Sequence, residues 1–288
     1  MVIGHGDTTR FLSNADVGRI VADGFAGEPI DGARVLVLIP DATRTMPMPL
    51  MFDVLAAEVG PRVAVLDYLV ALGTHQPMSD EQLSRLVGRP VVNGVTGRSR
   101  ILNHRWDLED TFTRLGTIPA AEIAELSGGR LQADVPVSLN RLLLDYDHLV
   151  ICGPVFPHEV VGFSGGTKYL VPGVAGPDII NFTHWLGAVI TSSAVIGAGY
   201  TPVRAVIDRA AAMVERPMSC ISLVVTHDGI AGLYVGPPDE SWAAASALSA
   251  RTHIHWVDRP FTRVLSVMPT MYDDLWTAAK GMYKLEPA

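Results

Sequence analysis

The chain has 288 residues, of which 48% are hydrophobic and 18% charged, and its formal net charge is −8. Such a chain can form one large or two small domains with a buried core. Its acidic balance argues against a nucleic-acid or anionic-membrane partner, since those contacts need clustered Lys and Arg. The N-terminus lacks the basic and apolar regions of a signal peptide, and no apolar run is long enough to span a membrane. The sequence therefore predicts a soluble cytoplasmic protein.

The first half of the chain alternates between helix and strand patterns. Capped or amphipathic segments predict helices at 14–26, 49–59 and 79–87. A continuous apolar run predicts a buried strand at 33–41, and a second buried strand is predicted at 62–73. This order predicts an α/β fold with a doubly wound, mostly parallel sheet and flanking helices. Residues 91–133 show no clear pattern; Asn103, His104 and Trp106, which lie there, are interpreted as structural.

The pattern recovers from Leu139 onward. We expect a short helix there, strands at 147–153, 219–227 and 262–269, helices at 178–186, 202–214 and 240–250, and a terminal helix from about Tyr272. Cys152 and Cys220 lie in apolar runs and are expected to be reduced core thiols. Residues 1–270 are predicted to form one α/β domain, and 271–288 a terminal helix or hinge.

Polar side chains follow three of the predicted strands. Asp41 and Arg44 follow the first strand, His75 follows the second, and His158 follows the strand at 147–153. Ligands of open α/β sheets bind at the carboxyl ends of the strands, so these residues should share one edge. Each could be an ordinary cap, turn or surface residue, but together they indicate a site. Two histidines can handle a proton on either face of a substrate, and an arginine can grip a carboxylate, which points to a small carboxylic acid.

The stretch GFSGGTKYLVPG, residues 162–173, places Lys168 among four glycines in a chain with three lysines. It is not a G-x-x-x-x-G-K-[ST] phosphate loop, because threonine precedes the lysine and tyrosine follows it. It matches the G-x-S-x-G elbow of serine hydrolases around Ser164, but the predicted strand ends at Gly153 and Pro172 prevents a following helix. Alternatively, the glycines let the backbone approach a bulky ligand that Lys168 contacts or binds covalently. His184 is either structural or a metal ligand.

These residues lie in segments that resemble the lactate racemase family, whose members use a nickel-pincer nucleotide. The matching segments occur in the same order along the chain and are DATRTMP, LGTHQPMSDEQL, FPHEVVGFSGGTKYLVPGVAG and NFTHW. The likeness spans most of residues 30–190 and continues more weakly beyond them. It implies the fold of the family's N-terminal domain and an isomerase, a racemase or epimerase of a small 2-hydroxy acid.

The resemblance also implies a role for each matching residue. Lys168 is similar to the lysine joined covalently to the cofactor, and His184 to the histidine that ligates the nickel. His75 and His158 resemble the paired acid/base histidines. Further expected cofactor contacts are Asp41, Arg44, Ser164, Gly165 and Gly166, and expected substrate contacts are Arg44, Lys280 and Thr277, the last standing where lactate racemase has a glutamine.

Family members generally continue into a second domain that closes over the cleft, and this chain stops where that domain is expected. Three alternatives stay open: the chain is a fragment, it is a natural short form, or a partner chain supplies the lid. The lid matters because a hydride-transfer site must exclude water. Two alternatives to the racemase stay open. One is a non-catalytic domain that binds the cofactor without turnover, and the other is a serine hydrolase that uses Ser164.

Overall fold

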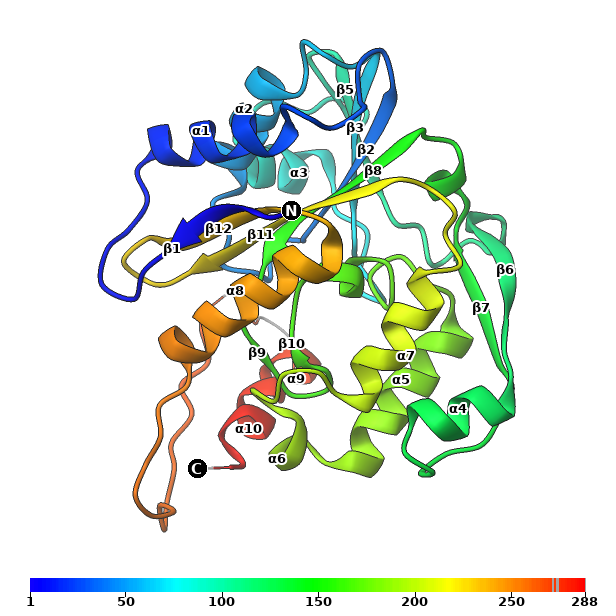
Figure 1. Ribbon diagram of the computed structural model, residues 1–288, viewed down its shortest axis with the longest axis vertical. Coiled ribbons are helices and arrows are strands. Elements are labelled where there is room, and N and C mark those ends of the chain that lie inside the picture. The colour runs from blue at the N-terminus through cyan, green and yellow to red at the C-terminus, as the bar shows by residue number, and fades with distance from the viewer. Residues whose placement is uncertain (271, 273–274, 288) are drawn as a thin grey trace.

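The computed structural model describes residues 1–270, 272 and 275–287, without the side chains of residues 276 and 277. Within this part of the chain the centre is an eight-stranded sheet of order β1-β12-β11-β8-β2-β3-β5-β4 (Figure 1). Its strands are β1 (Ile3–Gly6), β2 (Arg34–Ile39), β3 (Val65–Val70), β4 (Val95–Thr96), β5 (Ser99–Asn103), β8 (His148–Pro154), β11 (Met218–Val225) and β12 (Ile230–Gly236). The five strands β11, β8, β2, β3 and β5 are parallel, whereas β1, β12 and β4 run antiparallel to their neighbours. The predicted mostly parallel sheet is confirmed.

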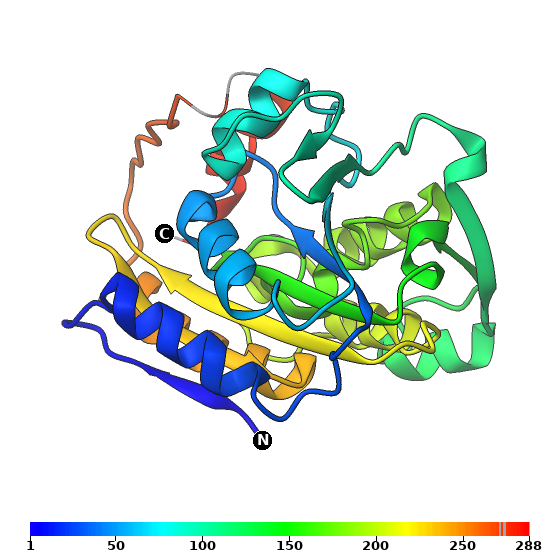
Figure 2. The same cartoon turned by 90° about the horizontal axis from the view of Figure 1, so that it is seen from above.

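Helices cover both faces of this sheet. The α-helices of the described part of the chain are α1 (Asn14–Phe25), α2 (Met48–Glu58), α3 (Asp80–Val87), α4 (Ala120–Leu126), α5 (Pro177–Ile190), α6 (Ser192–Val195), α7 (Pro202–Ala211), α8 (Pro238–His253), α9 (Leu275–Ala278) and α10 (Lys280–Leu285). Seen from above, α1 and α2 lie in front of the strands and α5 and α7 behind them (Figure 2). None of the helices in the described part of the chain is long and apolar enough to cross a membrane.

The alternation of side chains along β2 explains the two layers. Val35, Val37 and Ile39 belong to the core beneath α1, α2 and α3, whereas Leu36 and Leu38 belong to the core on the face of α5 and α7. Successive side chains of a strand point to opposite faces, so a continuous apolar run buries both. The apolar strand predicted at 33–41 is thus what a doubly wound sheet requires.

The segment that had no clear pattern contributes one strand to a separate two-stranded sheet. β6 (Phe112–Ile118) and β7 (Val135–Asn140) pair antiparallel outside the main sheet, with α4 between them in sequence. A second small ladder joins β9 (Pro157–His158) to β10 (Gly162–Phe163). This short ladder folds the chain after β8 back on itself and brings the glycine-rich stretch to the end of the sheet.

One predicted strand is wrong. Residues 262–269 form no strand in the structure, and Leu265 and Val267 are 87% and 82% exposed. Their alternating apolar side chains fit strand geometry, but a strand also needs a neighbour for its backbone hydrogen bonds. No described segment pairs with them. β1 and β12 were not predicted, because their glycines interrupt the apolar pattern.

Candidate active site

A cavity of about 400 Å³ lies at the carboxyl ends of the parallel strands. Asp41 and Arg44 reach it from the end of β2, His75 from the end of β3 and His158 from the segment after β8. Its other lining residues include Ser164, Gly165, Lys168, His184 from α5 and Lys280 from α10. The structure therefore brings most of the residues singled out in the sequence together around one cavity. Gly166 is not among the lining residues, and the side chain of Thr277 lies outside the described residues.

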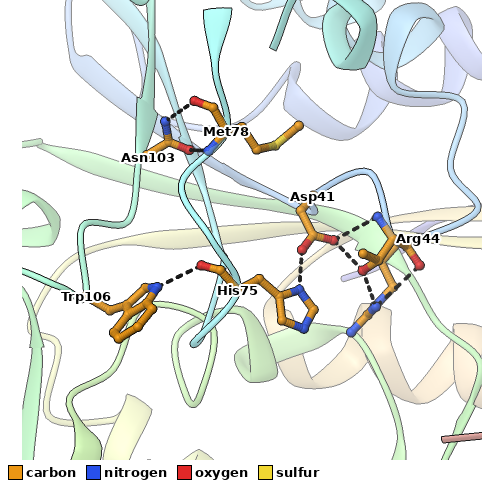
Figure 3. Close-up of polar contacts among 7 residues, drawn as sticks. Asp41, Arg44, His75, Met78, Asn103 and Trp106 are labelled. Atoms are coloured by element: carbon orange, nitrogen blue, oxygen red, sulfur yellow. Dashed lines mark hydrogen bonds and ion pairs between the residues drawn. The ribbon is translucent and has the colours of Figure 1, made fainter. Parts of the chain in front are cut away.

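The first part of the site is a chain of hydrogen bonds through Asp41 (Figure 3). His75 Nδ1 lies 2.5 Å from Asp41 Oδ2, and the Thr43 amide and hydroxyl both donate to Asp41 Oδ1, at 3.0 and 2.6 Å. Burial alone would raise the pKa of Asp41, but His75, Arg44 and Thr43 together lower it to about 2. The carboxylate therefore accepts a hydrogen bond from His75 Nδ1–H, which leaves Nε2 of the neutral ring as a proton acceptor.

The loop that carries His75 is fixed from the end of β5 and from the segment after it. Trp106 Nε1 donates to the His75 carbonyl at 2.7 Å, and the Asn103 amide exchanges two hydrogen bonds with the Met78 backbone (Figure 3). His104, fully buried, contacts Asn140 at 3.0 Å, and burial lowers its pKa to about 4. None of these residues lines the cavity, in agreement with their interpretation as structural.

His158 has the opposite arrangement from His75. Its Nδ1 accepts the backbone N–H of Val160 at 3.1 Å, so the neutral ring carries its proton on Nε2. Burial lowers the pKa of His158 well below its usual value, and Lys168, Lys284 and Arg44 lower it further. The Glu159 carboxylate lies 3.6 Å from Nδ1. The rings of His75 and His158 therefore differ, one offering an acceptor and the other a donor.

Lys168 and His184 are suited to hold a bound group. Burial, followed by Arg44 and Lys280, lowers the pKa of Lys168 to about 7, so a large fraction of the amine is neutral and nucleophilic at neutral pH. His184 Nδ1 donates to the Ile180 carbonyl one turn earlier in α5, at 2.8 Å. This bond fixes the tautomer and leaves Nε2 able to ligate a metal.

Ser164 is held in a way that does not suit a nucleophile. Its hydroxyl donates to the Pro154 carbonyl at 2.9 Å and accepts the Phe156 amide at 3.0 Å. In an activated serine the hydroxyl donates to a base instead. Ser164 thus fastens the glycine-rich stretch to the end of β8, and the geometry does not favour a serine hydrolase.

Sequence reasoning missed several charged or aromatic residues around the cavity. Glu159 is buried beside His158, and its Oε2 has no hydrogen-bond partner among the described residues. Lys284 lies one turn after Lys280 on α10, with its amine 4.9 Å from the centre of the Phe156 ring. The i, i+4 spacing of the two lysines could have indicated that they share a helix face. Arg204 and Trp242, below the glycine-rich stretch, carried no local signal.

The fold and this cleft define an α/β protein that binds its ligand at the carboxyl edge of a parallel sheet. The model of the lactate racemase N-terminal domain matches residues 27–197, more than half of the chain, and the chain belongs to that family. Racemases are therefore the general class of enzyme to which it is related.

Curated relatives agree with this assignment. The chain is 26% identical over 152 residues to lactate racemase of Thermoanaerobacterium thermosaccharolyticum and 28% identical over 153 residues to that of Lactiplantibacillus plantarum. Each match covers 52% of this chain and 32% of the relative, so the similarity spans about a third of the length of those enzymes.

Solved structures extend the likeness to nearly the whole chain. A crystal structure of a Thermotoga maritima protein matches with a TM-score of 0.86 and 27% identity over 98% of this chain and 69% of its own. The lactate racemase apoprotein of T. thermosaccharolyticum matches with a TM-score of 0.63 and 19% identity over 85% of this chain and 56% of its own, which supports the fold. The expected fold of the lactate racemase N-terminal region is confirmed.

Proposed function

We propose that this chain racemises or epimerises a small 2-hydroxy carboxylic acid with a nickel-pincer nucleotide as cofactor. The observation that carries the proposal is the pair of histidines in one cavity, His75 with a free acceptor nitrogen and His158 with a donor nitrogen. A reaction that exchanges the two faces of a substrate needs a proton-handling group on each side. Membership of the lactate racemase N-terminal domain family supports the same chemistry.

The residues present fit the cofactor. Lys168 offers a partly neutral amine for the covalent bond, and His184 Nε2 offers a nitrogen for nickel. Arg44 and Lys280 supply positive charge for anionic groups. Among the described residues no group of three or more His, Cys, Asp or Glu side chains is arranged as a metal site, and the resemblance assigns the remaining nickel ligands to the cofactor itself. When bound, the cofactor supplies an acceptor that takes the α-hydrogen as hydride and returns it.

The protein's own residues handle the carboxylate and the protons. Arg44 and Lys280 bind the substrate carboxylate, the arginine through its planar fork. His75 Nε2 takes the hydroxyl proton, and the Asp41 carboxylate stabilises the imidazolium that results. After the substrate has rotated in the site, His158 Nε2 donates a proton to its oxygen. The proton that His75 took up returns through solvent to His158, so that both rings end the cycle neutral. The same groups serve the reverse reaction with their roles exchanged.

The test is to produce the chain together with the enzymes that make the cofactor. We expect bound nickel and an added mass on Lys168, both lost in Lys168→Met, with Lys284→Met as the matched control that keeps them. Loaded protein should interconvert the enantiomers of a 2-hydroxy acid and return an α-deuterium without exchange into solvent, since hydride does not exchange with water. An unmodified Lys168 under these conditions would contradict the cofactor assignment. Retained nickel without interconversion would favour the non-catalytic binding domain.

A further inference from the structure

Arg204 of α7 lies beneath the glycine-rich stretch and is only 1% exposed. Its guanidinium donates to the Phe163 carbonyl at 2.6 Å and to the Gly165 carbonyl at 3.2 Å. A planar guanidinium can hold two acceptors in fixed directions, which the single ammonium of a lysine cannot do. Burying a charge costs free energy unless it is hydrogen-bonded, and these two carbonyls supply such acceptors for Arg204.

Trp242 of α8 completes the support of the same segment. Its indole N–H donates to the Ser164 carbonyl at 2.9 Å, and its ring lies 4.3 Å from the Arg204 guanidinium carbon. The carbonyls of residues 163, 164 and 165 are thus each bound by a side chain from α7 or α8. Gly166, which has φ of +58°, lies against the same indole, where a side-chain carbon would come within 3.1 Å.

These contacts continue directly to Lys168. The Gly165 carbonyl that accepts from Arg204 also accepts the backbone N–H of Lys168, at 3.3 Å. The Thr167 hydroxyl accepts from Arg204 at 3.3 Å and donates to Asp208, one turn further along α7. The residue before Lys168 and the carbonyl that binds its amide are therefore both held from one helix.

We propose that Arg204 is a positioning residue for Lys168: Arg204 fixes the glycine-rich backbone so that the Lys168 amine projects into the cavity. This proposal rests on the proposed function only in assigning a cofactor to the Lys168 amine. Arg204 and Trp242 both lie beyond residues 27–197, which match the family model. The region after residue 197 therefore acts as a brace for the site, through α7 and α8.

Because the chain has three lysines, the position of the Lys168 amine can be tested directly by cross-linking, on protein that carries no cofactor. We expect difluorodinitrobenzene, a short amine-to-amine cross-linker, to join Lys168 to Lys280, which both line the cavity, and to join Lys280 to Lys284 within α10. The second link does not involve the glycine-rich stretch and serves as an internal reference. Peptide mass spectrometry measures the ratio of the two links, which depends on where the Lys168 amine lies.

We expect Arg204→Lys and Arg204→Ala to lower this ratio about tenfold, the effect of losing roughly one hydrogen bond to a charged group. Millimolar guanidinium should restore the ratio in Arg204→Ala, and ammonium should not. The matched control is Arg216→Lys, since Arg216 also binds two backbone carbonyls, of Tyr146 and Leu144, but away from the cavity. Trp242→Phe, which keeps a ring but loses the N–H, should give a smaller decrease.

An unchanged ratio in Arg204→Lys, or an equal loss in Arg216→Lys, would overturn the proposal. So would a wild-type chain that gives no link between Lys168 and Lys280. If an Arg204 variant does not fold, Trp242→Phe decides instead, and an unchanged ratio there counts against the brace. Because the cross-linking measurement needs no cofactor, it still tests the role of Arg204 if the protein fails to load nickel in the separate experiment.

Discussion

Replacing Asp41 by asparagine should move the proton of the neutral His75 ring from Nδ1 to Nε2. In the native site the Thr43 amide and hydroxyl both donate to Asp41 Oδ1, and Oδ2 accepts from His75 Nδ1. The Thr43 hydroxyl cannot change partner freely, because it already accepts from Arg44 at 2.6 Å. An asparagine must therefore turn its oxygen toward Thr43 and its NH₂ toward His75. The NH₂ donates to Nδ1, so the His75 proton moves to Nε2 and the base becomes a donor.

The size of the effect follows from the pKa of Asp41. Its surroundings lower that pKa from 3.8 to about 2, which corresponds to about 2.5 kcal/mol in favour of the carboxylate, or a factor of roughly 60. This net value sets the order of magnitude of the part due to His75, since burial opposes it and Arg44 and Thr43 share it. We expect Asp41→Asn to lower turnover of the loaded enzyme by roughly this factor, because the residual population with the correct tautomer is small.

Nitrogen-15 NMR of the histidine rings measures the tautomer without cofactor, and His75→Gln identifies the relevant signal. The matched control is Asp67→Asn, since Asp67 is also buried and binds Arg100 and Tyr146, remote from the cavity. Wild type and Asp67→Asn should show protonated Nδ1 in His75, and Asp41→Asn should show protonated Nε2. A His75 ring that keeps its proton on Nδ1 in Asp41→Asn would refute this reasoning.

Three further predictions concern titration and the hydroxyl of Ser164. Burial and then Arg44 lower the pKa of Lys168 to about 7, so Arg44→Met should move the midpoint of Lys168 acetylation, followed by mass spectrometry, to higher pH. Burial lowers the pKa of His104 to about 4. Between pH 7 and pH 4 the unfolded chain, in which this pKa is near 6.5, therefore binds a proton that the native state does not bind. Urea titrations should show the free energy of unfolding falling by up to about 3 kcal/mol over this range, and by less in His104→Phe. Ser164→Ala should cost about 1–3 kcal/mol in the same assay, and wild-type Ser164 should not react with a fluorophosphonate.

The sheet and the edge that carries the site could be predicted because they depend on local patterns. The runs at β2, β3 and β8 are mostly apolar, with Asp67 as an interruption in β3, and polar residues follow each of them. The strand predicted at 262–269 was wrong for the complementary reason, since a local pattern does not say whether a neighbouring strand exists. β12 was missed because two glycines obscure a segment whose burial depends on its partners.

Arg204 shows what could not be predicted in the site. Within α7 it reads as one of two arginines on an amphipathic helix, and such residues are normally exposed. It is buried because carbonyls about forty residues earlier in the chain turn toward it, through glycines with positive φ at 165 and 166. The tautomers of His75 and His158 depend in the same way on single contacts, to Asp41 and to the Val160 amide.

The opposite tautomers of His75 and His158 also constrain the kinetics expected of a racemase. Substrate and product are then mirror images, so the equilibrium constant is unity and kcat/KM must be equal for both enantiomers at every pH. The enantiomer whose hydroxyl faces the acceptor nitrogen of His75 meets a site already in the required protonation state, whereas the other needs the protons of the two rings exchanged. We therefore expect kcat and KM to differ between the enantiomers by the same factor, measured in initial rates from each pure form. Unequal kcat/KM would show that the two compounds are not enantiomers interconverted by this site alone, and would favour an epimerase whose substrate carries a second stereocentre.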